Sequence, residues 1–172
     1  PSRTRVLQLL SSQIAVSIEN ARLYDVQEKL RAASARFVPT EFLESLGRDS
    51  IRDVILGDAV RTTMTVLFAD IRGFTSIAER STAEDVFKLL NRYLAGVVPV
   101  IRNNHGFIDK FIGDAVMGLF PREPADAVRA AIDIAHAVKA VNTELEGEGM
   151  PPLAIGIGIH TGDIVLGTVG SD

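Results

Sequence analysis

The chain contains no cysteine among its 172 residues. This absence excludes disulfide bonds, thiolate metal sites and cysteine nucleophiles. No apolar run reaches the roughly 18 residues that a membrane-spanning helix needs, and the first residues lack the pattern of a signal peptide. A basic surplus is also missing, because the formal net charge is −4 and the pI is about 5.4. That charge argues against a general nucleic-acid surface.

The composition indicates a folded globular chain. Hydrophobic residues make up 47% and charged residues 23%, which is typical of globular rather than disordered proteins. The length fits one compact domain with an appendage. The absence of cysteine is compatible with the cytoplasmic location that we expect. Because the chain starts at Pro1 without an initiator methionine, we also expect it to be a piece of a longer protein.

The N-terminal segment carries apolar side chains at every seventh position. They are Leu9, Val16, Leu23, Leu30 and Phe37. No glycine or proline interrupts the segment between Arg3 and Val38. A sustained seven-residue apolar repeat favours a left-handed coiled coil. We predict a dimerising or signalling helix here, and the alternative is an amphipathic helix that packs on its own domain.

The remaining sequence predicts alternating strands and helices. The expected strands are residues 62–70, Phe107–Phe111, Ala115–Phe120, Leu153–His160 and Ile164–Val169, and the expected helices are residues 75–81, 81–103 and 124–144. Thr75 or Ser76 is the expected cap of the first helix, and Ser81 with Glu84 forms a capping box for the second. Split βαβ units of this kind give an α+β, ferredoxin-like palm, an antiparallel sheet with helices on one face.

Two aspartates stand at strand ends in this scheme. Asp70 closes the first strand, and Asp114 lies in the turn of the hairpin. The first strand of a palm lies beside the hairpin, so the two carboxylates are expected to converge. Paired carboxylates can hold two metal ions that activate an attacking oxygen and stabilise a leaving phosphate. Aspartates are also common turn formers, and that structural interpretation stays open.

The residues that follow Asp70 predict a phosphate-binding turn. Gly73 permits a tight turn, and the amides of Phe74 and Thr75 are placed to point at a phosphate. The alternative is an ordinary joint between a strand and a helix.

Two further features suggest a close contact with another group. Lys110 lies within a strand, where alternation places it on the face opposite Asp109 and Phe111. A solvated sheet edge and a ligand contact both explain a lysine at that position. Gly156 and Gly158 share one face of a later strand, which implies that another group approaches closely there.

The segments Thr65–Ser76 and Phe107–Phe120 together resemble class III nucleotidyl cyclases, the adenylyl and guanylyl cyclases. Three more segments fit the same family in the same order, namely Arg36–Leu43, Ile157–Gly162 and Val165–Ser171. The resemblance runs from about Phe37 to the end of the chain. A shorter segment, Gln13–Tyr24, resembles the last helix of a GAF sensory domain.

The resemblance implies a metal site and a reaction. Asp70 and Asp114 would be the metal-binding carboxylates for two Mg²⁺ or Mn²⁺ ions, and the backbone carbonyl of Ile71 would be a further ligand. The reaction would be attack of the ribose 3′-hydroxyl of ATP on the α-phosphate. It yields 3′,5′-cyclic AMP and pyrophosphate.

The resemblance also assigns substrate contacts. The turn at Gly73, with the amides around Phe74 and Thr75, would hold the triphosphate. Lys110 would recognise the adenine ring. Guanylyl cyclases usually carry a glutamate at that position, so Lys110 favours ATP and an adenylate cyclase.

The resemblance further implies a homodimer, since family enzymes build each active site from both subunits. We expect a signalling helix over residues 1–36, the end of an upstream sensory domain, then a connector over 37–61 and the cyclase core over 62–172. The family's second base-reading residue, ribose-orienting asparagine and transition-state arginine would lie beyond Asp172. The 172-residue chain is therefore expected to be inactive alone.

Three alternatives remain open at this point. One is a non-catalytic pseudo-cyclase that transmits a signal as a dimerisation module. Another is guanylate cyclase activity, which Lys110 disfavours. A diguanylate cyclase is disfavoured too, because its Gly-Gly-Asp/Glu-Glu-Phe hairpin is replaced here by Ile112–Ala115.

Overall fold

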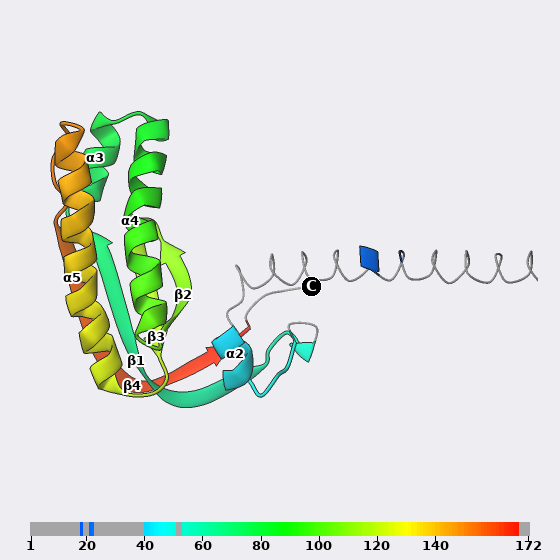
Figure 1. Cartoon of the computed structure of the whole chain (residues 1–172). Helices are drawn as coiled ribbons and strands as arrows, with labels where there is room; N and C mark the ends of the chain where they lie inside the picture. The colour runs from blue at the N-terminus through cyan, green and yellow to red at the C-terminus, as the bar shows by residue number, and fades with distance from the viewer. Residues whose placement is uncertain (1–17, 19–20, 23–39, 51–52, 169–172) are drawn as a thin grey trace, which may run out of the picture. The chain divides into compact units, whose positions relative to one another are not determined.

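The computed structural model describes residue 18 and residues 21–22, 40–50 and 53–168 (Figure 1). Residues 1–40 and 41–172 form separate compact units, and the fold described below is that of the second. Ile18, Ala21 and Arg22 are helical, whereas the rest of the predicted coiled coil and GAF-like segment lies outside the described residues. In the described ranges, no helix combines the length and the apolar character needed to cross a membrane.

The second unit is built on a four-stranded antiparallel sheet in the order β2-β3-β1-β4. The elements in chain order are α2 (Thr40–Ser45), β1 (Ala59–Ile71), α3 (Phe74–Arg80), α4 (Ala83–Asn103), β2 (Phe107–Ile112), β3 (Ala115–Phe120), α5 (Pro124–Gly147) and β4 (Ile155–Gly167). This order confirms the predicted α+β palm, with β1 beside the β2–β3 hairpin. The domain boundaries given above stay a prediction.

Residues 155–167 form one strand, so the prediction of two separate strands in this region is wrong. β4 runs for 13 residues and pairs with β1 along its whole length. Residues 161–163, which separated the two predicted strands, stay paired with β1, and side-chain hydrogen bonds support this pairing. The hydroxyls of Thr65 and Thr161 lie 2.9 Å apart, and the carboxylate of Asp163 accepts a 2.7 Å hydrogen bond from Thr63. β1 itself begins at Ala59, three residues before the predicted start.

Helix α4 begins one residue later than the predicted capping box. Its N-cap is Thr82, not Ser81, and the Thr82 hydroxyl accepts a hydrogen bond of 3.2 Å from the backbone N–H of Asp85. An N-cap side chain satisfies one of the free N–H groups of the first helical turn. The helix continues through Pro99 to Asn103, so this proline does not shorten it.

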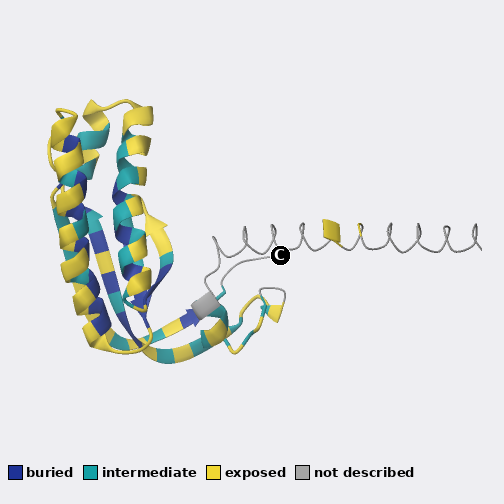
Figure 2. Cartoon of the chain, viewed as in Figure 1, coloured by how far each residue is buried: buried dark blue, intermediate teal, exposed yellow. Residues whose placement is uncertain are grey.

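The core lies between one face of the sheet and helices α4 and α5 (Figures 1 and 2). Leu67, Ala69 and Ile71 alternate along β1 and are buried in it. The buried helical residues are Tyr93, Val97 and Ile101 of α4 and Ala127, Ala130, Ile134, Val138, Val141 and Leu145 of α5. The helical periodicity of residues 124–144 also predicts an inward-facing Ala135, and this prediction is wrong because the residue is exposed.

A second buried cluster contains the β1 residue Met64. Its other members are Phe107, Leu119 and Leu166, and Phe42 of α2 packs against them. Because side chains alternate along a strand, Met64, Phe68 and Asp70 belong to the face of β1 opposite Leu67 and Ala69. That face is less covered, since Phe68 is 41% exposed. The sheet therefore offers an open surface on which Asp70 stands.

Replacing Gly106 with alanine is expected to destabilise the fold by about 1–3 kcal/mol, because overpacking a full core costs energy of that order. An added Cβ would lie 2.6 Å from the ring of Phe120 and 2.9 Å from Ile101, both buried. Urea denaturation measures the effect. The matched control is Gly147→Ala at the end of α5, where no atom lies within 4 Å of the added Cβ and where alanine should be neutral or stabilising. Equal stability of the two variants would contradict this account of the core.

Candidate active site

Asp114 is held against the end of β1. It follows Gly113 in the tight turn between β2 and β3, where Gly113 has a φ of 62°. One carboxylate oxygen of Asp114 accepts a 2.8 Å hydrogen bond from the backbone N–H of Ile71. This bond joins the hairpin turn to the residue after Asp70. The two predicted carboxylates are thus brought to the same end of neighbouring strands.

Asp70 stands beside Arg72 and Gly156 on the open face. The Oδ1 atom of Asp70 is buried and lies 3.9 Å from Nε of Arg72, too far for a hydrogen bond. Gly156 is paired with Asp70 across β1 and β4, and a Cβ there would collide with the Arg72 guanidinium. The predicted close approach is therefore confirmed at Gly156. It is wrong at Gly158, where an added Cβ meets no atom within 4 Å.

The turn after Asp70 uses Gly73 as predicted. Gly73 has a φ of 70°, in the left-handed region that glycine adopts without strain, and it precedes the first residue of α3. No side chain caps this helix, so the prediction that Thr75 or Ser76 does so is wrong. Phe74 and Thr75 instead occupy the first turn of α3, where backbone N–H groups lack intrahelical acceptors.

Lys110 lies apart from the two aspartates, on the edge strand β2. The pairing of β2 with β3 shifts register between Ile108 and Lys110, which marks a bulge at Asp109. Strict alternation does not hold at such a bulge. Accordingly, Nζ of Lys110 lies 3.1 Å from a carboxylate oxygen of Asp109, although the two side chains were expected on opposite faces.

The strand register nevertheless places Lys110 on the same face as Asp70. Lys110 pairs with Met117, Met117 with Phe68, and Phe68 with Gly158. Directly paired residues share a face, and Asp70 follows Phe68 by two positions in β1. Two strand spacings separate Lys110 from β1, which is about 10 Å. The Lys110 side chain is 59% exposed, so this row is open to solvent.

The donor set at the end of β1 suits a hard divalent cation. Mg²⁺ prefers oxygen ligands and is usually bound by one or two carboxylates together with water and substrate phosphates. Asp70 and Asp114 supply two carboxylates, and the unpartnered Oδ1 of Asp70 offers a free lone pair. No group of three or more histidine, cysteine or acidic residues forms a metal site within the described residues. A metal here would therefore need ligands from a nucleotide or water.

Tyr93 is a buried polar residue on the core side of β1 that the sequence did not single out. It belongs to α4, is fully buried, and shares the core with Ala69 and Ile71. Burial raises the pKa of Tyr93, and the negative charges of Asp114 and Asp70 raise it further. Its hydroxyl is therefore a neutral donor at physiological pH. The sequence showed only an apolar helical stripe at this position.

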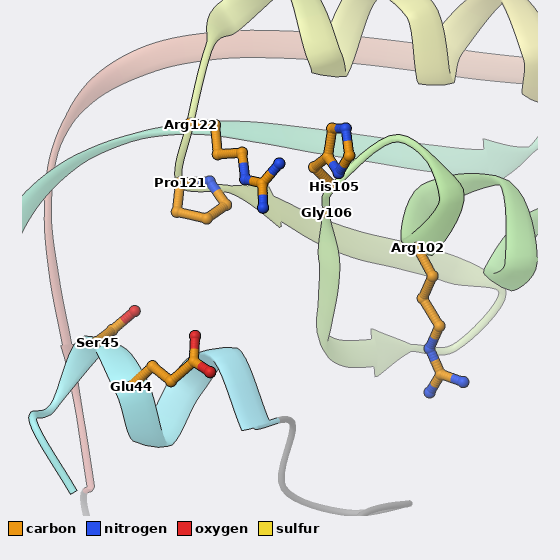
Figure 3. Close-up of a pocket in the computed structure, with 7 residues that line it drawn as sticks. All are labelled: Glu44, Ser45, Arg102, His105, Gly106, Pro121 and Arg122. Atoms are coloured by element: carbon orange, nitrogen blue, oxygen red, sulfur yellow. The ribbon is translucent and has the colours of Figure 1, made fainter.

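A separate pocket of about 390 Å³ lies between α2, the end of α4 and the residues after β3 (Figure 3). It is lined by Glu44, Ser45, Arg102, His105, Gly106, Pro121 and Arg122. Figure 3 shows the side chains of Glu44 and Ser45 rising from α2 into the space below Pro121 and Arg122. None of the predicted site residues lines it, so this pocket is distinct from the two aspartates.

Comparison with known proteins gives matches over the part of the chain that contains Asp70, Lys110 and Asp114. The sequence model described as "Adenylate and Guanylate cyclase catalytic domain" matches residues 59–172. An adenylate cyclase of Anabaena cylindrica is 42% identical over 140 residues, which are 78% of this chain and 28% of that protein. A terminal-differentiation-specific adenylate cyclase of Dictyostelium discoideum is 37% identical over 150 residues, 84% of this chain and 7% of that protein. This chain therefore spans less than a third of either relative.

Solved structures share the fold. The guanylyl cyclase Cya2 is 38% identical and superposes with a TM-score of 0.61, over 66% of this chain and 61% of that one.

Proposed function

Because this chain belongs to the adenylate and guanylate cyclase catalytic domain family, we propose that it is the core of an adenylate cyclase. The proposed reaction converts ATP to 3′,5′-cyclic AMP and pyrophosphate. One observation carries the proposal: the Ile71 N–H holds the Asp114 carboxylate at the end of β1, next to Asp70. This hydrogen bond supports the proposal, because it ties the hairpin turn that carries Asp114 to the residue that follows Asp70.

In this proposal Asp70, Asp114 and the carbonyl of Ile71 hold two Mg²⁺ or Mn²⁺ ions. When bound, such ions neutralise phosphate charge and favour the alkoxide form of the ribose 3′-hydroxyl. The chain's own contribution is positional. The Ile71 N–H fixes one Asp114 oxygen, which leaves the rest of that carboxylate available. The turn at Gly73 offers the first amides of α3, those of Phe74 and Thr75, to the triphosphate.

Lys110 is the proposed adenine-reading residue. It shares the open face with Asp70 at about two strand spacings, a span on the scale of a nucleotide. A lysine ammonium is a donor only, and it suits a ring nitrogen acceptor such as adenine N1. The 38% identity to a guanylyl cyclase supports GTP as the second candidate substrate.

We further propose that two copies of the chain form the working enzyme. Phe68 is a large apolar side chain that is 41% exposed on the open face beside Asp70. A second subunit that covers this face would complete the site and bury the ring. The predicted N-terminal helix would hold the two chains together and carry the signal of an upstream sensory domain. The reaction needs ATP, which supports a cytoplasmic location.

The test is cyclic nucleotide formation by the full-length product of the gene that encodes this chain. Purified protein is given ATP or GTP with Mg²⁺ or Mn²⁺, and the products are separated by chromatography. Cyclic AMP from ATP is the expected result, with little product from the 172-residue chain alone. Cyclic GMP from GTP would favour the second candidate. The absence of both products would indicate a signalling module without catalysis.

A further inference from the structure

Arg72 follows the last residue of β1 and carries its guanidinium onto the open face of the sheet. Its backbone N–H donates a 2.8 Å hydrogen bond to the carbonyl of Ala154, just before β4, which ties the two strand ends together. Gly156 pairs with Asp70, and directly paired residues share a face of the sheet. A Cβ on Gly156 would point to that face and would collide with the Arg72 guanidinium. The guanidinium therefore lies on the face that carries Asp70.

The space that holds this guanidinium exists because Gly156 has no side chain. The three heavy atoms nearest to an added Cβ are Nη2, Cζ and Nε of Arg72, so the group lies close against the backbone of β4. A glycine within a strand often marks a place where another group approaches closely. Any larger residue at position 156 would displace the guanidinium from Asp70. Gly156 and Arg72 therefore form one arrangement, although they are far apart in the sequence.

The donors of this guanidinium are unused within the described part of the chain. Its one ion pair there is the 3.9 Å approach of Nε to Oδ1 of Asp70, which is too long for a hydrogen bond. The Arg72 side chain is 67% exposed, so a ligand can reach it. An arginine carries five N–H donors in a planar fork that matches the oxygens of phosphate. Arg72 thus offers a positive charge and free donors beside a predicted metal ligand.

We propose that Arg72 binds the phosphate chain of the nucleotide, and that Gly156 provides the space for the guanidinium to do so. This inference rests on the proposed function, in which Asp70 holds a metal ion. Mg²⁺ is usually bound by one or two carboxylates together with substrate phosphates. Phosphate oxygens on such a metal lie next to the carboxylate, and Nε of Arg72 is already 3.9 Å from that carboxylate. Hydrogen bonds from arginine to phosphate are stronger than those between neutral groups.

Binding of α,β-methylene-ATP to the full-length gene product measures the contact. This analogue keeps three phosphates, and its P–C–P bridge replaces the P–O–P bond that the proposed reaction breaks. With saturating Mn²⁺, Arg72→Ala is expected to weaken analogue binding about tenfold or more, as measured by isothermal titration calorimetry. Arg72→Lys keeps the charge without the planar fork, so it should recover only part of the loss.

Binding of Mn²⁺ alone, followed by electron paramagnetic resonance, shows whether Arg72 acts on phosphate or through the metal ligand. Arg72→Ala removes a positive charge beside Asp70, so Mn²⁺ affinity without nucleotide should stay the same or rise. The matched control is Arg61→Ala. Arg61 is another exposed arginine of β1, and its guanidinium donates a 3.1 Å hydrogen bond to Asp163 instead. That control should change neither the Mn²⁺ affinity nor the analogue affinity.

Gly156→Ala tests the space that the guanidinium occupies. The added methyl group should displace Arg72 and weaken analogue binding about as much as Arg72→Ala does. In the Arg72→Ala background the same glycine substitution should have little further effect. Additive losses would overturn the role of Gly156. Thermal melts check that each variant folds, and the Arg72 variants test the phosphate contact without adding an atom to the sheet.

The outcomes separate this inference from the proposed function. Equal analogue affinity in wild type and Arg72→Ala would overturn the phosphate contact and leave the metal site intact. A parallel loss of Mn²⁺ affinity in Arg72→Ala would also overturn it, because Arg72 would then act through Asp70. Failure of the wild-type protein to bind Mn²⁺ would overturn the metal site and, with it, the phosphate contact.

Discussion

Replacement of Asp114 by asparagine is expected to reduce cyclic AMP formation by the full-length gene product by about a hundred- to a thousandfold. Metal ions supply several kcal/mol of charge stabilisation to phosphoryl transfer, and each 1.36 kcal/mol is a factor of ten in rate. Asparagine keeps an oxygen that can accept the N–H of Ile71, so the hairpin should stay docked on β1. The substitution therefore removes mainly the negative charge. Turnover with saturating Mg²⁺ and with Mn²⁺ measures the loss.

A second variant, Asp114→Ala, distinguishes the effect of the negative charge from the effect of the hydrogen bond to the Ile71 N–H. It removes both the charge and the acceptor, so it should match asparagine in lost turnover and be less stable to heat. Asp133→Asn is a suitable control, because Asp133 lies on the exposed face of α5 and accepts a hydrogen bond from Asn104. That variant should keep its activity. Retention of activity in Asp114→Asn would remove this carboxylate from the mechanism.

The fold was largely predictable because its apolar periodicities are strong. The hairpin strands and helices α4 and α5 lie where the alternating and helical patterns placed them. The prediction of two strands in place of β4 was wrong because residues 161–163 have a turn-forming composition. Pairing with a 13-residue partner strand overrides that local signal. The predicted N-caps of α3 and α4 were wrong for a related reason. Several adjacent residues have side chains that can cap a helix, and the path of the backbone decides whether one of them does so.

Some positions in the site could be predicted because they follow from the order of the strands along the chain. Asp70 and Asp114 were expected to converge because β1 lies beside the hairpin in a palm. The Ile71 hydrogen bond shows that the hairpin turn docks on the end of β1, and the joint role of the two aspartates stays a prediction. The pairing of Lys110 with Asp109 was not predictable, since a bulge leaves no clear mark in the sequence. Tyr93 was hidden within an apolar stripe. Periodicity indicates that Tyr93 is buried, but it does not reveal that the hydroxyl lacks a hydrogen-bond partner among the described residues.

Substitution of Lys110 by glutamate is expected to lower the kcat/KM for ATP about ten- to a hundredfold and to shift preference toward GTP. One lost specific contact to a base is worth about 1–3 kcal/mol. The glutamate would also repel acceptor atoms of adenine, while it could accept from the donor groups of guanine. Competition between ATP and GTP in one reaction mixture, with both cyclic products quantified, measures the ratio directly.

The choice of control for this substitution depends on the charged residue next to Lys110. Glutamate at position 110 would stand beside Asp109, so repulsion rather than base recognition could reduce activity. Lys110→Ala avoids that repulsion, and it should lose activity on ATP without gaining activity on GTP. Lys139→Glu on the exposed face of α5 reproduces the charge change away from the open face and should leave the substrate ratio unchanged. If neither Lys110 variant alters the ratio, the lysine is only a solvated residue of the edge strand β2, and base choice depends on other groups.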